Sequence, residues 1–296
     1  MKKVLNANVL KIIACLSMLI DHIGKIAYLF FPSDTMYWVN YSFSIIGRLA
    51  FPIFVFLLIE GFYHTSNIKK YFIRLGIMAI LIGLSEIILG LIPSLNMAST
   101  MFQSGNIFID LILILAALYL FNHKDPRVKF LTLAPILYFV VSLLFQNETF
   151  YVYSDVTKAI MSGFLTQYSF VSPCLIVLFL IINYIYNYII HRKFNQEVLD
   201  SIDQTTLFKD VRINSYIFAV SILALLMYAF TYLITDTSIL NTSYVINTYF
   251  ILSIVPIFFY SGKLGKSNIY IKSAYYLFYP LHLGIIFLVT YLISLI

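Results

Sequence analysis

Nine apolar stretches, each long enough to cross a lipid bilayer, dominate this sequence. A transmembrane helix needs about 20 predominantly apolar residues, and the chain is 61% hydrophobic but only 11% charged. The stretches are residues 9–31, 42–63, 72–92, 105–122, 128–146, 170–191, 214–234, 244–261 and 273–294. Because backbone polar groups must be paired inside a bilayer, the pattern predicts an all-α fold. We expect a polytopic transmembrane helical bundle of about nine spans (9–10), forming a single domain over residues 1–296.

Basic residues lie at alternate connections between these stretches. Sixteen of the 19 Lys and Arg residues follow this pattern. They are Lys2, Lys3, Lys11, Lys69, Lys70, Arg74, Lys124, Arg127, Lys129, Arg192, Lys193, Lys209, Arg212, Lys263, Lys266 and Lys272. Cytoplasmic loops carry such an excess, so the alternation predicts a cytoplasmic amino terminus. The net charge of +6 follows from this topology and indicates a lipid bilayer as partner, with no nucleic acid.

Two segments do not fit the simple pattern of spans. Residues 147–169 mix polar and apolar side chains, which is typical of either an amphipathic helix at the outer face or a re-entrant piece. Residues 192–212 form the one sizeable polar stretch, for which we expect a short cytoplasmic loop with a helix.

Ionisable residues lie inside the predicted spans, where charge is costly and usually marks a pathway or a reaction site. Counting about 1.5 Å per helical residue places them about 8 to 14 Å from the outer face. They are Asp21, Lys25, Arg48, Glu86 and Asp110, with His22 beside Asp21 and His282 near the same depth. Groups of both signs at a shared depth predict one polar cavity that is accessible from outside.

Helical geometry assigns some of these residues to each other. Asp21 and His22 are sequence neighbours and point about 100° apart, so they cannot form a hydrogen-bonded dyad. Asp21 faces Lys25 one turn later, and the two charges can neutralise each other within the span. His22 then needs another orienting partner, for which Glu86, Asp110 and a tyrosine all remain open.

Two further charges belong to the predicted cytoplasmic half of the membrane. Lys11 lies about three turns before His22 on nearly the same helix face. Glu60 lies at a similar depth on the next span, so the two can form an interfacial ion pair. A cationic stripe from Lys11 towards His22 also suits an anionic cofactor that enters from the cytoplasm.

The histidines have two interpretations. An imidazole titrates near neutral pH, so His22 in a half-hydrated cavity can act as a general base. A membrane histidine can equally make an interhelical hydrogen bond, and His282, two residues after Pro280, fits a structural role as well. The sequence contains no glycine-rich phosphate loop, Gly-x-Ser-x-Gly element or zinc-type His/Cys spacing, so we predict no metal site.

Five sequence blocks carry a family resemblance: LKIIACLSMLIDHIGKI (10–26), IIGRLAFPIFVFLLIEGFYHTSNIKKYFIRL (45–75), SEI (85–87), FFYSGKLG (258–265) and YYLFYPLHL (275–283). They resemble the TraX family, integral membrane proteins named for the conjugation factor that N-acetylates pilin. The resemblance is close in the first, second and last spans and fades over 125–250. The family is similar to a wider set of multi-span acyltransferases, which carry a basic residue, ten intervening residues and an essential histidine in the first span. Lys11 and His22 match that spacing, whereas Arg48 is the one candidate for their arginine-rich second motif.

The resemblance implies a bacterial plasma-membrane acetyltransferase that uses acetyl-CoA as acyl donor. Its acyl acceptor would be a peptide, a glycan or a small molecule, with His22 as general base in a ternary complex. Catalytic roles fall to His22, Asp21 and Arg48, and donor-binding roles to Lys11, Glu60 and Lys25. Glu86, Asp110 and His282 would line the substrate cavity.

Two other functions stay open at this point. In a proton-coupled transporter of a small anionic solute, the acidic residues and His22 would relay protons, and Lys25 and Arg48 would bind the anion. In a non-enzymatic assembly factor for a surface polymer, the embedded charges would only specify how the helices pack.

Overall fold

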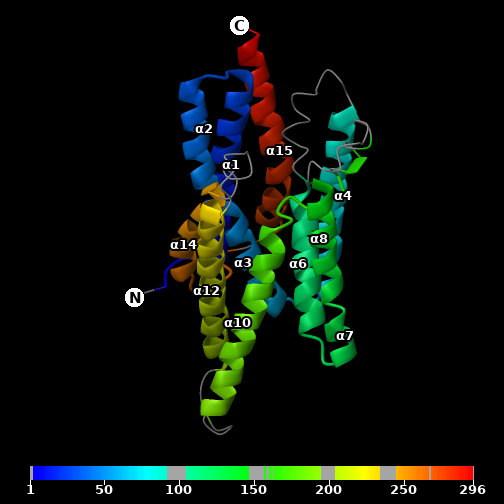
Figure 1. Cartoon of the computed structure of the whole chain (residues 1–296), viewed down its shortest axis with the longest axis vertical. Coiled ribbons are helices and arrows are strands. Elements are labelled where there is room, and N and C mark those ends of the chain that lie inside the picture. Colours follow the sequence, from blue (N-terminus) through cyan, green and yellow to red (C-terminus); the bar gives the residue numbers. More distant parts are fainter. Residues whose placement is uncertain are drawn as a thin grey trace. The chain divides into compact units, whose positions relative to one another are not determined.

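A computed structural model describes residues 3–91, 105–146, 157, 160–161, 163–194, 204–233, 245–266 and 268–295 (Figure 1). Its helices are α1 (Ala7–Phe30), α2 (Asp34–Gly47), α3 (Ala50–His64), α4 (Ile68–Leu91), α6 (Ile107–Phe121), α7 (Pro126–Phe130), α8 (Leu133–Gln146), α10 (Val171–Lys193), α12 (Gln204–Leu233), the 3₁₀ helix η3 (Tyr249–Ser253), α14 (Ile254–Phe258) and α15 (Ile269–Ser294). These elements confirm the predicted all-α membrane bundle.

Each of the nine predicted spans contains a helix. Among the described residues, seven helical segments are long and apolar enough to cross a membrane, and two shorter apolar ones cover Ile107–Phe121 and Val245–Phe258. Large apolar side chains are exposed along one face of α15, as expected for a helix in lipid. They are Leu277, Leu281, Ile285, Leu288 and Leu292.

The structure differs from the predicted boundaries most clearly in the second and seventh spans. The second span is interrupted after Gly47 and resumes at Ala50, so Arg48 lies at a break between α2 and α3. Helix α12 begins at Gln204, well before the predicted residue 214. Residues 204–212 contain neither glycine nor proline, so the helix continues without interruption into the polar segment. The mixed segment 147–169 lies largely outside the described residues.

The chain divides into two compact units, residues 1–57 with 178–296 and residues 58–177. In the first unit, α1 lies between α2 and α15 (Figure 1). Helix α15 runs parallel to α1, because Lys11 contacts the Tyr275 ring, His22 contacts His282, and Phe30 contacts Phe287. Two terminal spans that point the same way require an odd number of crossings, and nine satisfies this.

The first unit also has a packed aromatic core. Tyr216 of α12 is fully buried, and its hydroxyl donates to the Pro52 carbonyl oxygen at 2.6 Å. The Phe56 ring lies 5.4 Å from the Tyr216 ring and 5.2 Å from the Tyr260 ring. These contacts fix the start of α3, and therefore the break that carries Arg48, against α12.

Helices α1 and α2 approach closely because glycines face the partner helix. A Cβ atom on Gly24 would lie 3.0 Å from the Cβ atom of Phe43. A Cβ atom on Gly47 would overlap the Asp21 side chain. Small residues at such crossings allow two membrane helices to pack backbone to backbone.

Replacing Gly47 with alanine should therefore displace Asp21 or separate α1 from α2. Overpacking of this kind costs about 1–3 kcal/mol, so we expect a clear fall in the thermal unfolding midpoint of the detergent-solubilised protein. Gly284→Ala in α15 is the matched control, since nothing lies within 4 Å of the added Cβ atom. A Gly47→Ala protein as stable as this control would contradict the close packing.

The second unit is built on α4, α6 and α8 and on the turn that precedes α10 (Figure 1). Asn106 caps α6 by accepting from the Phe108 amide, and its side-chain nitrogen donates to the Ala79 carbonyl of α4 at 2.7 Å. Ser142 of α8 accepts from the Thr166 amide at 2.8 Å. Polar side chains at these contacts satisfy backbone groups of the irregular segment between helices.

Candidate active site

A cluster of charges lies where α1 crosses the break between α2 and α3. The Lys25 ammonium is 2.6 Å from Oδ2 of Asp21, as the spacing of four residues predicts. The Arg48 guanidinium approaches the same oxygen at 3.8 Å. The Asp21 and Arg48 side chains are 9% and 13% exposed and largely shielded from solvent, whereas Lys25 is 35% exposed. One buried carboxylate therefore pairs with two cations.

Arg48 is held by contacts from several elements. Its Nε donates to the Ser44 carbonyl oxygen at 3.3 Å, and its Nη1 donates to Oδ1 of Asn247 at 3.1 Å. Sequence reasoning did not identify Asn247, because one amide at the start of an apolar stretch gives no signal of its own. These bonds fix the guanidinium plane and leave its charge directed towards Asp21.

His22 of α1 and His282 of α15 form a direct pair. Nδ1 of His22 lies 2.8 Å from Nε2 of His282, and the two rings stack with centroids 5.0 Å apart. Nδ1 of His282 lies 2.7 Å from the carbonyl oxygen of Phe278. The partner that the sequence left open among Glu86, Asp110 and a tyrosine is thus another histidine.

The Phe278 carbonyl fixes the tautomers of a neutral pair. A carbonyl oxygen only accepts, so Nδ1 of His282 must carry a hydrogen and donate it. In neutral His282 the Nε2 atom is then an acceptor, and Nδ1 of His22 must donate to it. The lone pair of His22 consequently resides on Nε2, the nitrogen suited to take up a proton.

Asp21 also keeps unused hydrogen-bonding capacity. Its Oδ2 atom serves Lys25 and Arg48, while its buried Oδ1 atom has no hydrogen-bond partner among the described residues. A buried carboxylate oxygen normally accepts at least one hydrogen bond. Oδ1 of Asp21 therefore keeps an unfilled acceptor position among the described residues.

Lys11 and Glu60 each have a described contact of their own. The Lys11 ammonium lies 5.3 Å from the centroid of the Tyr275 ring, within cation–π distance. Glu60 belongs to the second unit, and its buried carboxylate lies 3.5 Å from Nε2 of His64, one turn further along α3. The expected pairing of Lys11 with Glu60 stays a prediction.

Asp110 and Glu86 also belong to the second unit. Fully buried Asp110 accepts from the Gln167 and Tyr168 amides at 2.7 and 3.2 Å and from the Ser172 hydroxyl at 2.6 Å. Through these hydrogen bonds the Asp110 side chain anchors the turn before α10. Glu86 is buried, and its Oε2 atom has no hydrogen-bond partner in the described part of the chain. Roles for these two carboxylates in lining a cavity remain predictions.

The structure thus brings part of the predicted set together. Asp21, Lys25 and Arg48 are in contact, and His22 follows Asp21 directly and contacts His282. Within the described ranges, no three His, Cys, Asp or Glu side chains form a group that could hold a metal ion. The arrangement instead combines an oriented imidazole with fixed cations, which suits proton transfer next to developing negative charge.

Comparison with known proteins identifies the family of this chain. The chain matches the family described as "TraX protein" over residues 6–290. A 112-residue segment is 36% identical to the "Probable fimbrial assembly protein FimC, serogroup H1" of Dichelobacter nodosus, covering 37% of this chain and 43% of that protein. The chain therefore spans less than half the length of this curated relative, and no solved structure matches it. Because the family match extends over nearly the whole sequence, the chain belongs to the TraX family.

Proposed function

We propose that the protein is a bacterial membrane acyltransferase that moves an acetyl group from acetyl-CoA to an amine or hydroxyl of its acceptor. The observation that carries this proposal is the fixed His22–His282 pair, which leaves Nε2 of His22 as the basic nitrogen. The Asp21, Lys25 and Arg48 charges next to it in the fold supply the electrostatic surroundings that acyl transfer requires.

The reaction proceeds in one ternary complex. The acceptor nitrogen or oxygen attacks the thioester carbonyl carbon, and Nε2 of His22 takes the proton that the nucleophile loses. The C–S bond breaks as the new C–N or C–O bond completes. The thiolate of CoA then receives the proton back from the His22 imidazolium, so His22 returns to its neutral state.

The neighbouring groups have complementary tasks in this scheme. Arg48, with Lys25, stabilises the negative charge that develops on the thioester oxygen. The free Oδ1 atom of Asp21 orients the acceptor through a hydrogen bond, while Oδ2 keeps the two cations in place. Since donors and charges are already fixed, little reorganisation is needed when the substrates bind.

Two likenesses support a choice of acceptor. The resemblance to the TraX family implies a pilin acetylase, and the Dichelobacter nodosus relative is described as a probable fimbrial assembly protein. We therefore propose the amino terminus of a fimbrial subunit as the first acceptor to test. A surface glycan is the second, because the same base can activate a hydroxyl.

The direct test uses purified protein in liposomes with radiolabelled acetyl-CoA and a fimbrial-subunit peptide that has a free amino terminus. We expect the labelled acetyl group to appear in the peptide, with one molecule of free CoA released for each acetyl group transferred. An amino-terminally blocked peptide is the control and should remain unlabelled. If neither the peptide nor a glycan acquires label, and the liposomes show substrate-dependent proton flux, the protein is a transporter and the acyltransferase proposal is wrong.

His282 should act as a positioning residue for His22. His282→Phe keeps a stacked ring but removes the acceptor nitrogen, so we expect kcat to fall about tenfold or more with little change in KM. His282→Gln offers a carbonyl oxygen to Nδ1 of His22 and should restore part of the rate.

The pH profile separates positioning from simple packing at His282. Loss of the acceptor changes the basicity of His22, so the pH–rate curve of His282→Phe should shift relative to wild type. Equal rates and superimposable profiles for the Phe and Gln variants would show that His282 only fills space.

A further inference from the structure

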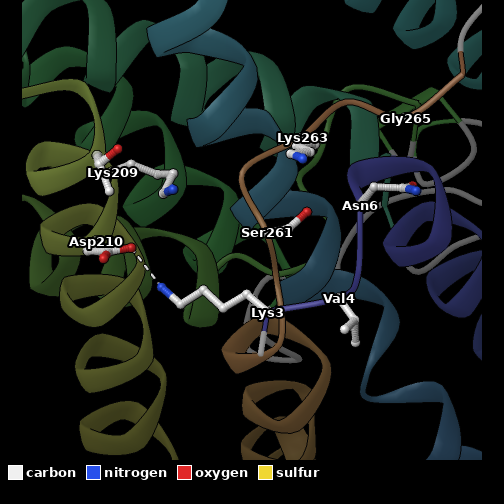
Figure 2. A pocket seen from close by; sticks show the side chains of 9 residues that line it. Lys3, Val4, Asn6, Lys209, Asp210, Ser261, Lys263 and Gly265 are labelled. Atoms are coloured by element: carbon white, nitrogen blue, oxygen red, sulfur yellow. Dashed lines mark hydrogen bonds and ion pairs between the residues drawn. The ribbon is translucent and has the colours of Figure 1, made fainter. Parts of the chain in front are cut away.

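A basic cavity of about 570 Å³ lies in the first unit, away from the charge cluster on α1 (Figure 2). Its walls come from the segment before α1, from α12 and from the segment after α14. Polar lining residues include Lys3, Asn6, Lys209, Asp210 and Lys263. The cavity has the size of a small-molecule site, and none of these residues belongs to the proposed active site.

Two extended segments form one wall of this cavity. The Leu5 amide donates to the Phe259 carbonyl at 2.9 Å, and the Ser261 amide donates to the Leu5 carbonyl at 2.7 Å. The Ala7 amide continues the ladder by donating to the Lys263 carbonyl at 2.9 Å. This backbone pairing ties the start of α1 to the SGKLG segment, residues 261–265.

Glycine is required at two positions of the SGKLG segment. Gly262 and Gly265 have φ angles of 78° and 83°, which side-chain-bearing residues rarely adopt. A Cβ atom on Gly262 would overlap the Lys209 side chain, and one on Gly265 would lie 2.7 Å from Oδ1 of Asn6. The segment can therefore lie directly against Lys209 and the amino-terminal cap of α1.

The cavity carries an excess of positive charge. Three lysines line it, against Asp210 as the one acidic residue among its lining side chains. Asp210 pairs with Lys3 at 2.6 Å, as the dashed line in Figure 2 shows. Lys209 and Lys263 form no ion pair with another described residue, so their charges are available for an anion. Lysines commonly bind phosphate as point charges.

We propose that this cavity binds the phosphate groups at the nucleotide end of the acyl donor, an inference that rests on the proposed function. Asn6 caps α1, whose axis leads from the cavity past Lys11 to His22, a rise of about 24 Å. A donor anchored here by its phosphates would extend its thioester arm along α1. The predicted topology places this end of α1 at the cytoplasmic face, where the donor is available.

Adenosine 3′,5′-bisphosphate, which lacks the arm and the acyl group, is the probe for this site. We expect it to bind the detergent-solubilised protein and to bind at least about tenfold more weakly to the double variant Lys209→Ala, Lys263→Ala. Lys209→Arg, Lys263→Arg should retain binding, as should His22→Ala. The matched control is Lys69→Ala, Lys70→Ala, which removes two exposed lysines of α4 outside the cavity.

An anionic phospholipid headgroup presents the same phosphate chemistry, so the titration is repeated in nanodiscs with and without phosphatidylglycerol. Bisphosphate affinity that is unchanged by this lipid supports the nucleotide site. Competitive loss of bisphosphate binding would make the cavity a lipid site and overturn the proposal, as would equal binding by the double alanine variant.

Transfer assays separate this inference from the proposed function. If the double alanine variant has an unchanged KM for acetyl-CoA while wild type transfers acetyl groups, the subsite is wrong and the enzyme stands. If the bisphosphate binds through these lysines but wild type transfers no acetyl group, the phosphate site in the cavity is supported and the proposed acyltransferase activity is contradicted.

Discussion

Replacing His22 with alanine is expected to lower acetyl transfer by at least about a hundredfold. General-base catalysis contributes about 10²- to 10⁴-fold, and Nε2 of His22 is the nitrogen that the His282 hydrogen bond leaves basic. The variant should bind acetyl-CoA as wild type does, because the loss affects the proton transfer and not donor affinity. Single-turnover transfer and equilibrium binding of the donor, measured on the same preparation, check both statements.

His191→Ala is the matched control for this experiment. His191 lies exposed near the carboxyl end of α10, so its loss should leave transfer unchanged. Unfolding midpoints of both variants close to wild type would exclude misfolding as a cause. Full transfer activity in His22→Ala would remove the proposed base and, with it, the mechanism.

The apolar spans could be predicted from the sequence because their signal is local. Length and hydropathy alone locate a helix that must satisfy its own backbone in lipid. The same local reasoning identified the Asp21–Lys25 pair, since four residues complete about one helical turn. At the start of α12 the helix begins ten residues before the predicted apolar span, inside the stretch 192–212 for which a loop with a helix was expected.

The rest of the site depends on contacts between segments that are far apart in the chain. His22 and His282 are separated by 260 positions, and Arg48 and Asn247 by 199. One sequence contains no information on which of several polar residues at similar depth will meet. Asp110 illustrates the difficulty, because its partners are backbone amides of a turn, and backbone groups have no sequence signature.

Two Asp–Lys pairs of equal length allow the cost of the embedded charges to be measured. Asp21–Lys25 and Asp210–Lys3 are both 2.6 Å long. Asp21 is 9% exposed and also approaches Arg48, whereas Asp210 is 43% exposed. Removing the Asp21 charge leaves two cations without compensation, Arg48 at 13% and Lys25 at 35% exposure, while removing the Asp210 charge leaves only Lys3, which is 36% exposed.

Asp21→Asn should therefore destabilise the protein by about 3 kcal/mol, the lower end of the range for a broken buried pair, because Lys25 is itself 35% exposed. Asp210→Asn should cost about 0–1 kcal/mol, as exposed pairs do. Thermal unfolding in detergent compares the two variants directly. Adding Lys25→Met to Asp21→Asn removes one uncompensated cation and should recover part of the loss. If the Asp21 and Asp210 variants unfold at the same temperature, the charges around Asp21 are well solvated. The site would then lack the preorganised electrostatics that the proposed acyl transfer requires.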